Sequence, residues 1–168
     1  MISKAELKDT EAISKLVNSA YRGDYAKKGW TTEAYLVEGT RTDAAQLADI
    51  INTPGATILK YERDGQIISC VELKTIDGRL YLGMLTVEPL IQGGGIGKEM
   101  LRASEDFGRQ QGCKSVFMRV VTKRTELIAW YERHGYKDNG ERMPFKFSDP
   151  RMGQATEPLE FLMMEKQL

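Results

Sequence analysis

A run of glycines between an apolar segment and an amphipathic segment is the part of the chain best suited to bind a phosphorylated ligand. Residues 80–87 are mostly apolar, and Pro89 ends this run. The glycines that follow lead directly into a helical pattern: Gly93, Gly94, Gly95 and Gly97. A helix that begins at such a loop exposes backbone N–H groups, which bind phosphate, and glycine leaves room for the phosphate oxygens. We therefore expect a phosphate or pyrophosphate site here.

Two common nucleotide-binding patterns do not fit this loop. A P-loop has a glycine where this chain has Gln92, and a Ser or Thr where this chain has Glu99. The hydroxyl that binds magnesium in a P-loop is therefore missing here. A Rossmann fingerprint requires a third glycine where this chain has Lys98 or, in the other register, Met100. The phosphorylated ligand is therefore expected to be of another kind.

A third pattern, Gln/Arg-x-x-Gly-x-Gly/Ala, fits residues 92–97. Here the chain resembles the GNAT superfamily of acetyl-CoA-dependent N-acetyltransferases. The preceding Val87-Glu-Pro89 matches the end of the family's fourth strand. A second match lies at residues 127–136, which resemble the family's later helix, where a functional tyrosine precedes a glycine by four residues. Tyr131 holds that position.

The resemblance implies a binding mode for acetyl-CoA as the co-substrate. In the family, the fourth and fifth strands splay apart and the pantetheine arm bonds to the exposed backbone of the fourth strand. The loop and the helix N-terminus hold the pyrophosphate, and nearby basic side chains add charge. The residues of this chain that match or extend those roles are Leu85, Val87, Gln92, Gly93, Gly94, Gly95, Ile96, Gly97, Lys98 and Arg133.

The resemblance also implies how an acetyl group is transferred. An amine attacks the thioester directly, and Tyr131 is the matched acid toward the departing thiolate. The base is left open, because Tyr81 stands where some members carry a glutamate. Glu72, in the neighbouring strand, is our candidate, since burial raises the pKa of a carboxylate toward a useful range. Many relatives have an asparagine that bonds the pantetheine or its neighbouring backbone; this chain departs from that pattern with Arg124.

The acceptor is expected to be a small primary amine or an amino-acid-like molecule. In the family, the region after the first helix forms one wall of the acceptor site, and Arg22, Trp30 and Glu33 are candidates there. The connection from Lys137 to Glu157 is a candidate for the opposite wall. Two other functions stay open, which are a catalytically silent acyl-CoA sensor and a protein or peptide N-acetyltransferase.

The elements that must position these residues follow from periodicity and turn signals. We expect an α+β fold in one domain, residues 1–168, with a mixed, mostly antiparallel sheet of about seven strands, a gap between strands 4 and 5, and about four helices. The expected strands are 1–6, 56–62, 66–75, 79–88, 115–121, 136–142 and 158–166. The expected helices are 9–21, 43–51, 96–111 and 126–134.

Composition restricts the possible partners and the compartment. The formal net charge is zero, which gives no reason to expect nucleic acid as a partner. Neither a signal peptide nor a transmembrane run is recognisable, so a cytoplasmic protein without a membrane partner is expected. Cys70 and Cys113 lack metal-type spacing, and no metal site is expected. The last strand, 158–164, is a candidate edge for a homodimer.

Overall fold

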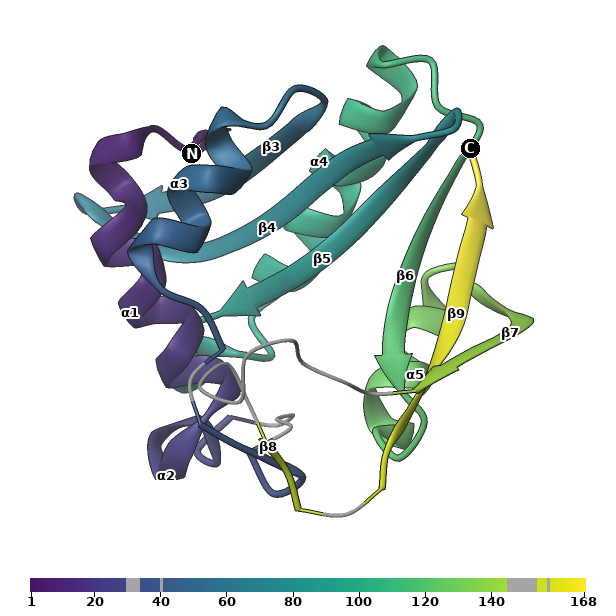
Figure 1. Ribbon diagram of the computed structural model, residues 1–168. Coiled ribbons are helices and arrows are strands. Elements are labelled where there is room, and N and C mark those ends of the chain that lie inside the picture. Colours follow the sequence, from purple (N-terminus) through teal and green to yellow (C-terminus); the bar gives the residue numbers. More distant parts are fainter. Residues whose placement is uncertain (30–33, 40, 145–153, 157) are drawn as a thin grey trace.

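The structure, a computed structural model, describes residues 1–29, 34–39, 41–144, 154–156 and 158–168. Its centre is a seven-stranded sheet in the order β1-β3-β4-β5-β6-β9-β7 (Figure 1). Every neighbouring pair is antiparallel except β5 and β6, which are parallel. This confirms the expected mixed sheet. The strands are β1 (Ile2–Lys4), β3 (Ala56–Arg63), β4 (Gln66–Ile76), β5 (Arg79–Val87), β6 (Ser115–Val121), β9 (Glu160–Gln167) and β7 (Lys137–Pro144).

Helices cover both faces of the sheet. Helices α1 (Thr10–Tyr21) and α3 (Ala44–Asn52) pack on one face through a cluster that includes Ile58, Cys70 and Met84 of the strands. Helix α4 (Ile96–Gln110) packs on the other face, and α5 (Thr125–Arg133) follows β6 on that same side (Figure 1). The short elements are η1 (Leu7–Asp9), α2 (Gly23–Ala26) and η2 (Pro89–Ile91).

Turn and capping residues explain where several of these elements begin and end. Asp64 and Gly65 have φ of 52° and 75°, as the tight turn between β3 and β4 requires. Asp77 and Gly78, with φ of 49° and 75°, make the corresponding turn before β5. The Asp43 carboxylate accepts a hydrogen bond of 2.8 Å from the Gln46 N–H and caps α3.

The sheet opens between β5 and β6. Only Leu80 with Val116 and Tyr81 with Phe117 are in register across this pair. Beyond Tyr81 the two strands diverge, as the family resemblance predicts. A β-bulge lies in the diverging part of β5, where the pairing with β4 shifts and Met84 adopts a φ of 55°. The gap therefore exposes the backbone of the last residues of β5.

Two features of the fold differ from the sequence-based expectations. The last strand does not offer a free edge, because β9 lies between β6 and β7, and β7 forms that edge of the sheet. The dimer edge expected at 158–164 is therefore wrong. In addition, β2 (Val37–Glu38) pairs with β8 (Gln154–Ala155) in a second sheet that joins the segment after α2 to the segment after β7. Two-residue strands carry no detectable periodicity, so this pairing was missed.

Candidate active site

The glycine loop forms a helix N-terminus with uncovered amides. Gly93 and Gly95 have φ of 89° and 88°, which strains any residue with a side chain. The hydrogen-bond ladder of α4 begins where the Glu99 N–H donates to the Gly95 carbonyl at 3.1 Å. The N–H groups of residues 96–98 precede this ladder, as at any helix start. The Ile96 side chain is buried in the core and anchors the first turn.

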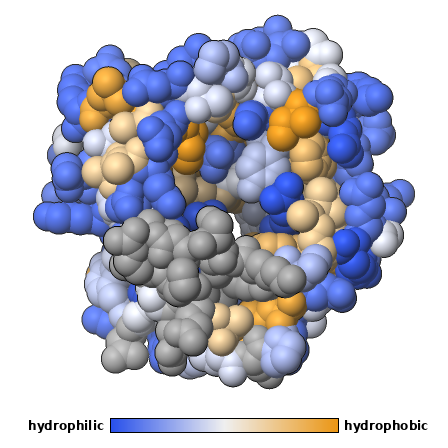
Figure 2. Space-filling view, in the orientation of Figure 1, coloured by the Kyte–Doolittle hydropathy of each residue, from blue (hydrophilic) through white to orange (hydrophobic). Residues whose placement is uncertain are grey.

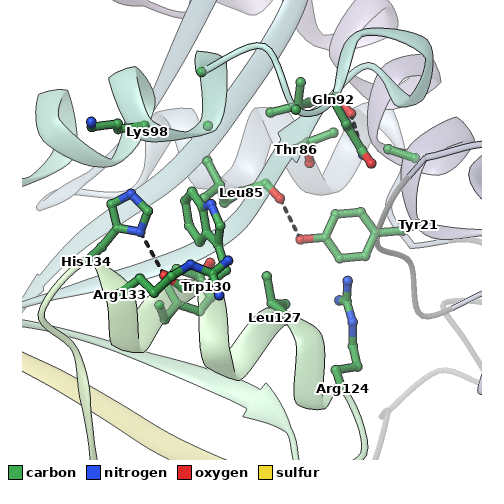
Figure 3. A pocket seen from close by; sticks show the side chains of 16 residues that line it. Tyr21, Leu85, Thr86, Gln92, Lys98, Arg124, Leu127, Trp130, Arg133 and His134 are labelled. Atoms are coloured by element: carbon green, nitrogen blue, oxygen red, sulfur yellow. Dashed lines mark hydrogen bonds between the residues drawn. The ribbon is translucent and has the colours of Figure 1, made fainter.

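A cavity of about 460 Å³ lies between the start of α4, the end of β5 and α5 (Figure 3). Lys98 and His134 lie at one end of the view, and Tyr21 and Arg124 lie at the other. Most of the residues predicted for coenzyme A meet here. The lining residues are Ala20, Tyr21, Leu85, Thr86, Val87, Gln92, Gly93, Gly95, Gly97, Lys98, Arg124, Leu127, Trp130, Tyr131, Arg133 and His134.

The lining of this first cavity fits a polyanion that ends in an apolar arm. Among the described lining residues the charged side chains are cationic, namely Lys98, Arg124 and Arg133, and none is a carboxylate. Lys98 and Arg133 are exposed and lie beside the helix N-terminus, where anion binding is favoured. Leu127 and Trp130 supply apolar surface between the two ends of the cavity (Figure 3). The chemistry of this lining therefore suits a pyrophosphate and its attached pantetheine.

The backbone of β5 in the gap already accepts two side-chain hydrogen bonds. The Tyr21 hydroxyl donates to the Leu85 carbonyl at 3.0 Å, and Gln92 Nε2 donates to the Val87 carbonyl at 3.1 Å (Figure 3). Gln92 also lies against Gly29, where an added Cβ would stand 2.1 Å from Gln92 Oε1. The turn after α2 thus supports the glycine loop.

Tyr131 is buried and lines the first cavity. Only 5% of its surface is exposed, and its ring meets Trp130 and Tyr136 edge-on, with centroids 5.1 and 5.8 Å away. Burial raises the pKa of the Tyr131 phenol above its ordinary value, and the positive charge of Arg124 partly opposes this rise. The phenol therefore keeps its proton at neutral pH and is a hydrogen-bond donor.

A second cavity, of about 240 Å³, lies where β5 and β6 separate. It shares five lining residues with the first cavity: Tyr21, Leu85, Arg124, Leu127 and Tyr131. Its other lining residues are Arg41, Tyr81, Leu82, Gly83, Met84, Met118, Arg119, Val120, Val121 and Phe161. Figure 2 shows the face that carries α1 and α3, with a hollow near its centre bordered by strongly hydrophilic side chains. The two cavities meet at Tyr131.

Glu72 lies beside the second cavity and outside the lining of either. It is half-buried on β4, opposite Gly83, and shares the face of the sheet to which Cys70 points. Burial raises the pKa of the Glu72 carboxyl, while the charges of Arg41 and Lys74 act in the opposite direction. The carboxylate is therefore close enough to feel Arg41, and it belongs to the surroundings of the second cavity.

The predicted acceptor residues are not brought together at either cavity. Arg22 is 6% exposed, and one of its guanidinium nitrogens donates to the Tyr21 carbonyl at 3.3 Å. It lines neither cavity. Trp30 and Glu33 lie outside the described residues. Among the residues predicted for coenzyme A, Gly94 and Ile96 do not line the first cavity with their own atoms.

Sequence reasoning missed residues whose contacts span long stretches of chain. Tyr21 reaches Leu85 from the last position of α1, and Gly29 meets Gln92 from the turn after α2. The only signal for Tyr21 was its place at the end of the apolar face of the first helix. Arg119 was overlooked because an exposed arginine in a strand has no pattern of its own.

Comparison with known proteins identifies the class. Residues 12–136 match the model of the Acetyltransferase (GNAT) family. The match covers most of the chain, so the chain belongs to this family and is an acetyl-CoA-dependent N-acetyltransferase. The described residues contain no helix long and apolar enough to cross a membrane, and within them no three metal-ligating side chains of the His, Cys, Asp and Glu types gather.

Three similar proteins illustrate the spread of the family. The chain is 26% identical to the "IAA acetyltransferase" of Azospirillum brasilense over 81% of this chain and 85% of that protein. It is 38% identical to the "Amino-acid acetyltransferase" of Pseudomonas putida over 49% of this chain, which is only 19% of that enzyme's length. The crystal structure of the ribosomal-protein-alanine N-acetyltransferase from Brucella melitensis superposes with a TM-score of 0.75 at 21% identity, over 100% of this chain and 99% of that one.

Proposed function

We propose that residues 1–168 act as one domain that transfers the acetyl group of acetyl-CoA to the primary amine of a small molecule. Both reactants are bound together, and the amine attacks the thioester directly. The observation that carries the proposal is that two cavities beside the gap between β5 and β6 both have Tyr131 in their linings. One cavity suits the donor, and the other is left for the acceptor.

The donor is held by the glycine loop and by the end of β5. The N–H groups of residues 93–97 bind the pyrophosphate, with Lys98 and Arg133 adding positive charge. The carbonyls of Leu85 and Val87 each accept one side-chain hydrogen bond. A carbonyl oxygen has two lone pairs, so both can still accept a second bond from the amides of the pantetheine arm.

Tyr131 and Glu72 share the proton transfers of the reaction. An alkyl ammonium has a pKa of roughly 10 and must lose a proton before its nitrogen can attack, which we assign to Glu72 directly or through water. The nitrogen then forms a bond to the carbonyl carbon, and the carbon–sulfur bond breaks. Tyr131 donates its proton to the departing thiolate and recovers one from the amide nitrogen. The products are one N-acetyl amine and one free thiol, and the proton that Glu72 took from the ammonium is released to water.

The test is a Tyr131→Phe variant measured by thiol release from acetyl-CoA across a panel of amines. We expect kcat to fall about a hundredfold or more, because the departing thiolate loses its donor. The KM for acetyl-CoA should stay close to that of the unchanged protein. Tyr61→Phe makes the same chemical change on β3, outside both cavities, and should keep full activity.

Two outcomes would contradict the proposal. If Tyr131→Phe turned over like Tyr61→Phe, the phenol would have no part in the transfer. If the protein bound coenzyme A tightly but released thiol with none of the amines, the chain would be an acyl-CoA-binding module rather than an enzyme.

A further inference from the structure

The charges of the second cavity indicate which amines it accepts. Among the described residues that line it, the charged side chains are three arginines: Arg41, Arg119 and Arg124. Two carboxylates of the described residues lie near them: Glu72 on the neighbouring strand, close to Arg41, and Glu126, whose oxygen is 4.0 Å from Arg124 Nε. We propose that this cavity binds the acceptor through an anionic group, so that the acceptor is a primary amine that carries a carboxylate. The inference rests on the function proposed above.

Arg41 and Arg119 are positioned to hold such a group. The Arg41 guanidinium stands over the Tyr21 ring at 5.3 Å, and the Arg119 guanidinium stands over the Tyr81 ring at 5.5 Å. An arginine stacked on a ring still presents the N–H groups along its edge, which form paired hydrogen bonds with a carboxylate. Within the described part of the chain, no carboxylate lies within ion-pair distance of either guanidinium.

Tyr81 helps to shape this end of the cavity. Its ring lies along the strand over Gly83, where an added Cβ would stand 2.6 Å from the Tyr81 hydroxyl. The same ring packs against Phe117 with centroids 5.6 Å apart, and Arg119 rests on it. The absence of a side chain at Gly83 therefore lets Tyr81 lie flat and hold Arg119 at the margin of the cavity.

Some residues line only the second cavity and others line both cavities, and this difference gives the acceptor an orientation. Arg41 and Arg119 line the second cavity only, whereas Arg124 and Tyr131 line both. A carboxylate bound at Arg41 and Arg119 therefore lies away from the donor. The amine at the other end of the molecule then points toward Tyr131, where the thioester must lie. Because Glu72 lies near Arg41, at the carboxylate end, it takes the proton of this amine through water. A compact amino acid satisfies both requirements in a cavity of about 240 Å³.

The same charges disfavour a cationic acceptor. Arg124 is 8% exposed, and its Nε lies 4.0 Å from the Glu126 carboxylate. Figure 3 shows its guanidinium directed toward Tyr21, at the end of the first cavity that adjoins the second. A polyamine would bring further positive charge next to Arg124, which is buried, and Arg41, which is half-buried, and like charges repel more strongly there than in open water.

The experiment compares matched acceptors in the same thiol-release assay. Free amino acids are tested against their carboxamides, which have nearly the same shape and lack the negative charge, and against spermidine. We expect kcat/KM to favour the best amino acid over its carboxamide by about ten- to a hundredfold, the range for a charge-assisted pair of hydrogen bonds. Spermidine should be poorer still.

Substitutions of single arginines test which of them bind the carboxylate of the acceptor. Arg119→Gln and Arg41→Gln should each raise the KM for the amino acid about tenfold or more, with the KM for acetyl-CoA unchanged. Arg63→Gln removes an arginine at the end of β3, outside both cavities, and should change neither constant. Arg119→Glu should reduce the preference for the amino acid over its carboxamide further, because the repulsion then acts on the anionic acceptor.

Different outcomes would contradict the anionic acceptor and the proposed function. If carboxamides, spermidine or peptide N-termini react as well as free amino acids, the enzyme stands and the anionic acceptor is wrong. If Arg119→Gln and Arg41→Gln keep the KM for the amino acid, the arginines do not bind it, and the inference is overturned. If coenzyme A neither binds nor is released as thiol with any amine, the proposed function fails first.

Discussion

Glu72, which we propose as the base, is also expected to affect the stability of the fold. Burial raises the pKa of its carboxyl, so the folded protein binds this proton more tightly than the unfolded chain does. As pH rises from the ordinary glutamate range through the raised pKa, the carboxylate becomes charged in a half-buried place. The free energy of unfolding therefore falls over that interval, so the charge that we propose as the base lowers the stability of the fold.

The prediction at this scale is that Glu72→Gln is more stable than the unchanged protein at pH 7 and far less active. The gain in the free energy of unfolding should disappear below the ordinary glutamate pKa, where both chains are neutral at this position. The kcat at pH 7 should fall about a hundredfold, as for other lost general bases. Urea unfolding and thiol release at several pH values measure the two effects.

A pH profile provides the decisive control for Glu72. In the unchanged protein, kcat should rise with pH through the raised pKa of Glu72, and this limb should be missing in Glu72→Gln. If the limb is the same in both proteins, another group is the base. The neutral Tyr131 phenol gives no competing limb at these pH values, since its pKa is raised and not lowered.

Site residues that belong to a short sequence motif could be predicted from the sequence. Site residues whose contacts join distant parts of the chain could not. The glycines of 93–97 and Tyr131 belong to short motifs, and the structure places most of them at one cavity. Tyr21 touches Leu85 across 64 positions, and no local pattern encodes such a contact. Arg22 was predicted from its loop position, but its guanidinium turns back to the chain's own backbone at Tyr21.

At the scale of elements, a buried hydrogen-bond network ties α4 to the strand at the end of the chain. The Tyr136 hydroxyl donates to Glu105 at 2.9 Å, and Lys166 of β9 donates to the same carboxylate at 3.1 Å. Tyr136 is 1% exposed and Glu105 is 6% exposed. The network thus fixes the segment after α5, and with it the helix that carries Tyr131.

Tyr136→Phe is expected to lower the free energy of unfolding by about 1–3 kcal/mol, the usual effect of removing a hydrogen bond to a buried charged group. At a temperature where the variant is folded, kcat should stay within about twofold of the unchanged protein, because the ring itself is retained. Denaturant unfolding and thiol release check both statements. A loss of kcat like that of Tyr131→Phe would show instead that the network positions the catalytic phenol.

The order of the elements along the chain was predictable because each has its own period and turn residues. The hairpins at Asp64-Gly65 and Asp77-Gly78, and the helix after the glycines, lie where the sequence indicates. The position of β9 in the sheet was not predictable, because the strand pattern at 158–166 does not say which neighbours it pairs with. Pairing is decided by the packing of the whole sheet.

At the scale of the molecule, ligand binding should be visible in thermal stability. A ligand that binds only the folded state adds about 2.7 kcal/mol when present at a hundred times its Kd. Coenzyme A should therefore raise the Tm clearly, and pantetheine at the same concentration should raise it much less, because it lacks the pyrophosphate expected at the glycine loop. Differential scanning calorimetry of the full chain measures both shifts.

The control for this prediction is Lys98→Ala combined with Arg133→Ala. Both residues are exposed at the first cavity, so the variant should fold normally and show a smaller shift with coenzyme A. An equal shift with coenzyme A and pantetheine would mean that the glycine loop makes no contribution to binding.

The two register pairs between β5 and β6 have a mechanical consequence for the molecule. A four-stranded plate, β1-β3-β4-β5, and a three-stranded plate, β6-β9-β7, meet along the sheet only at Leu80 with Val116 and Tyr81 with Phe117. The sheet is therefore stiff within each plate and compliant at the seam between them. A ligand bound between the diverging ends of β5 and β6 would contact both plates at the end opposite these pairs, and it would hold the two halves of the sheet at a fixed separation.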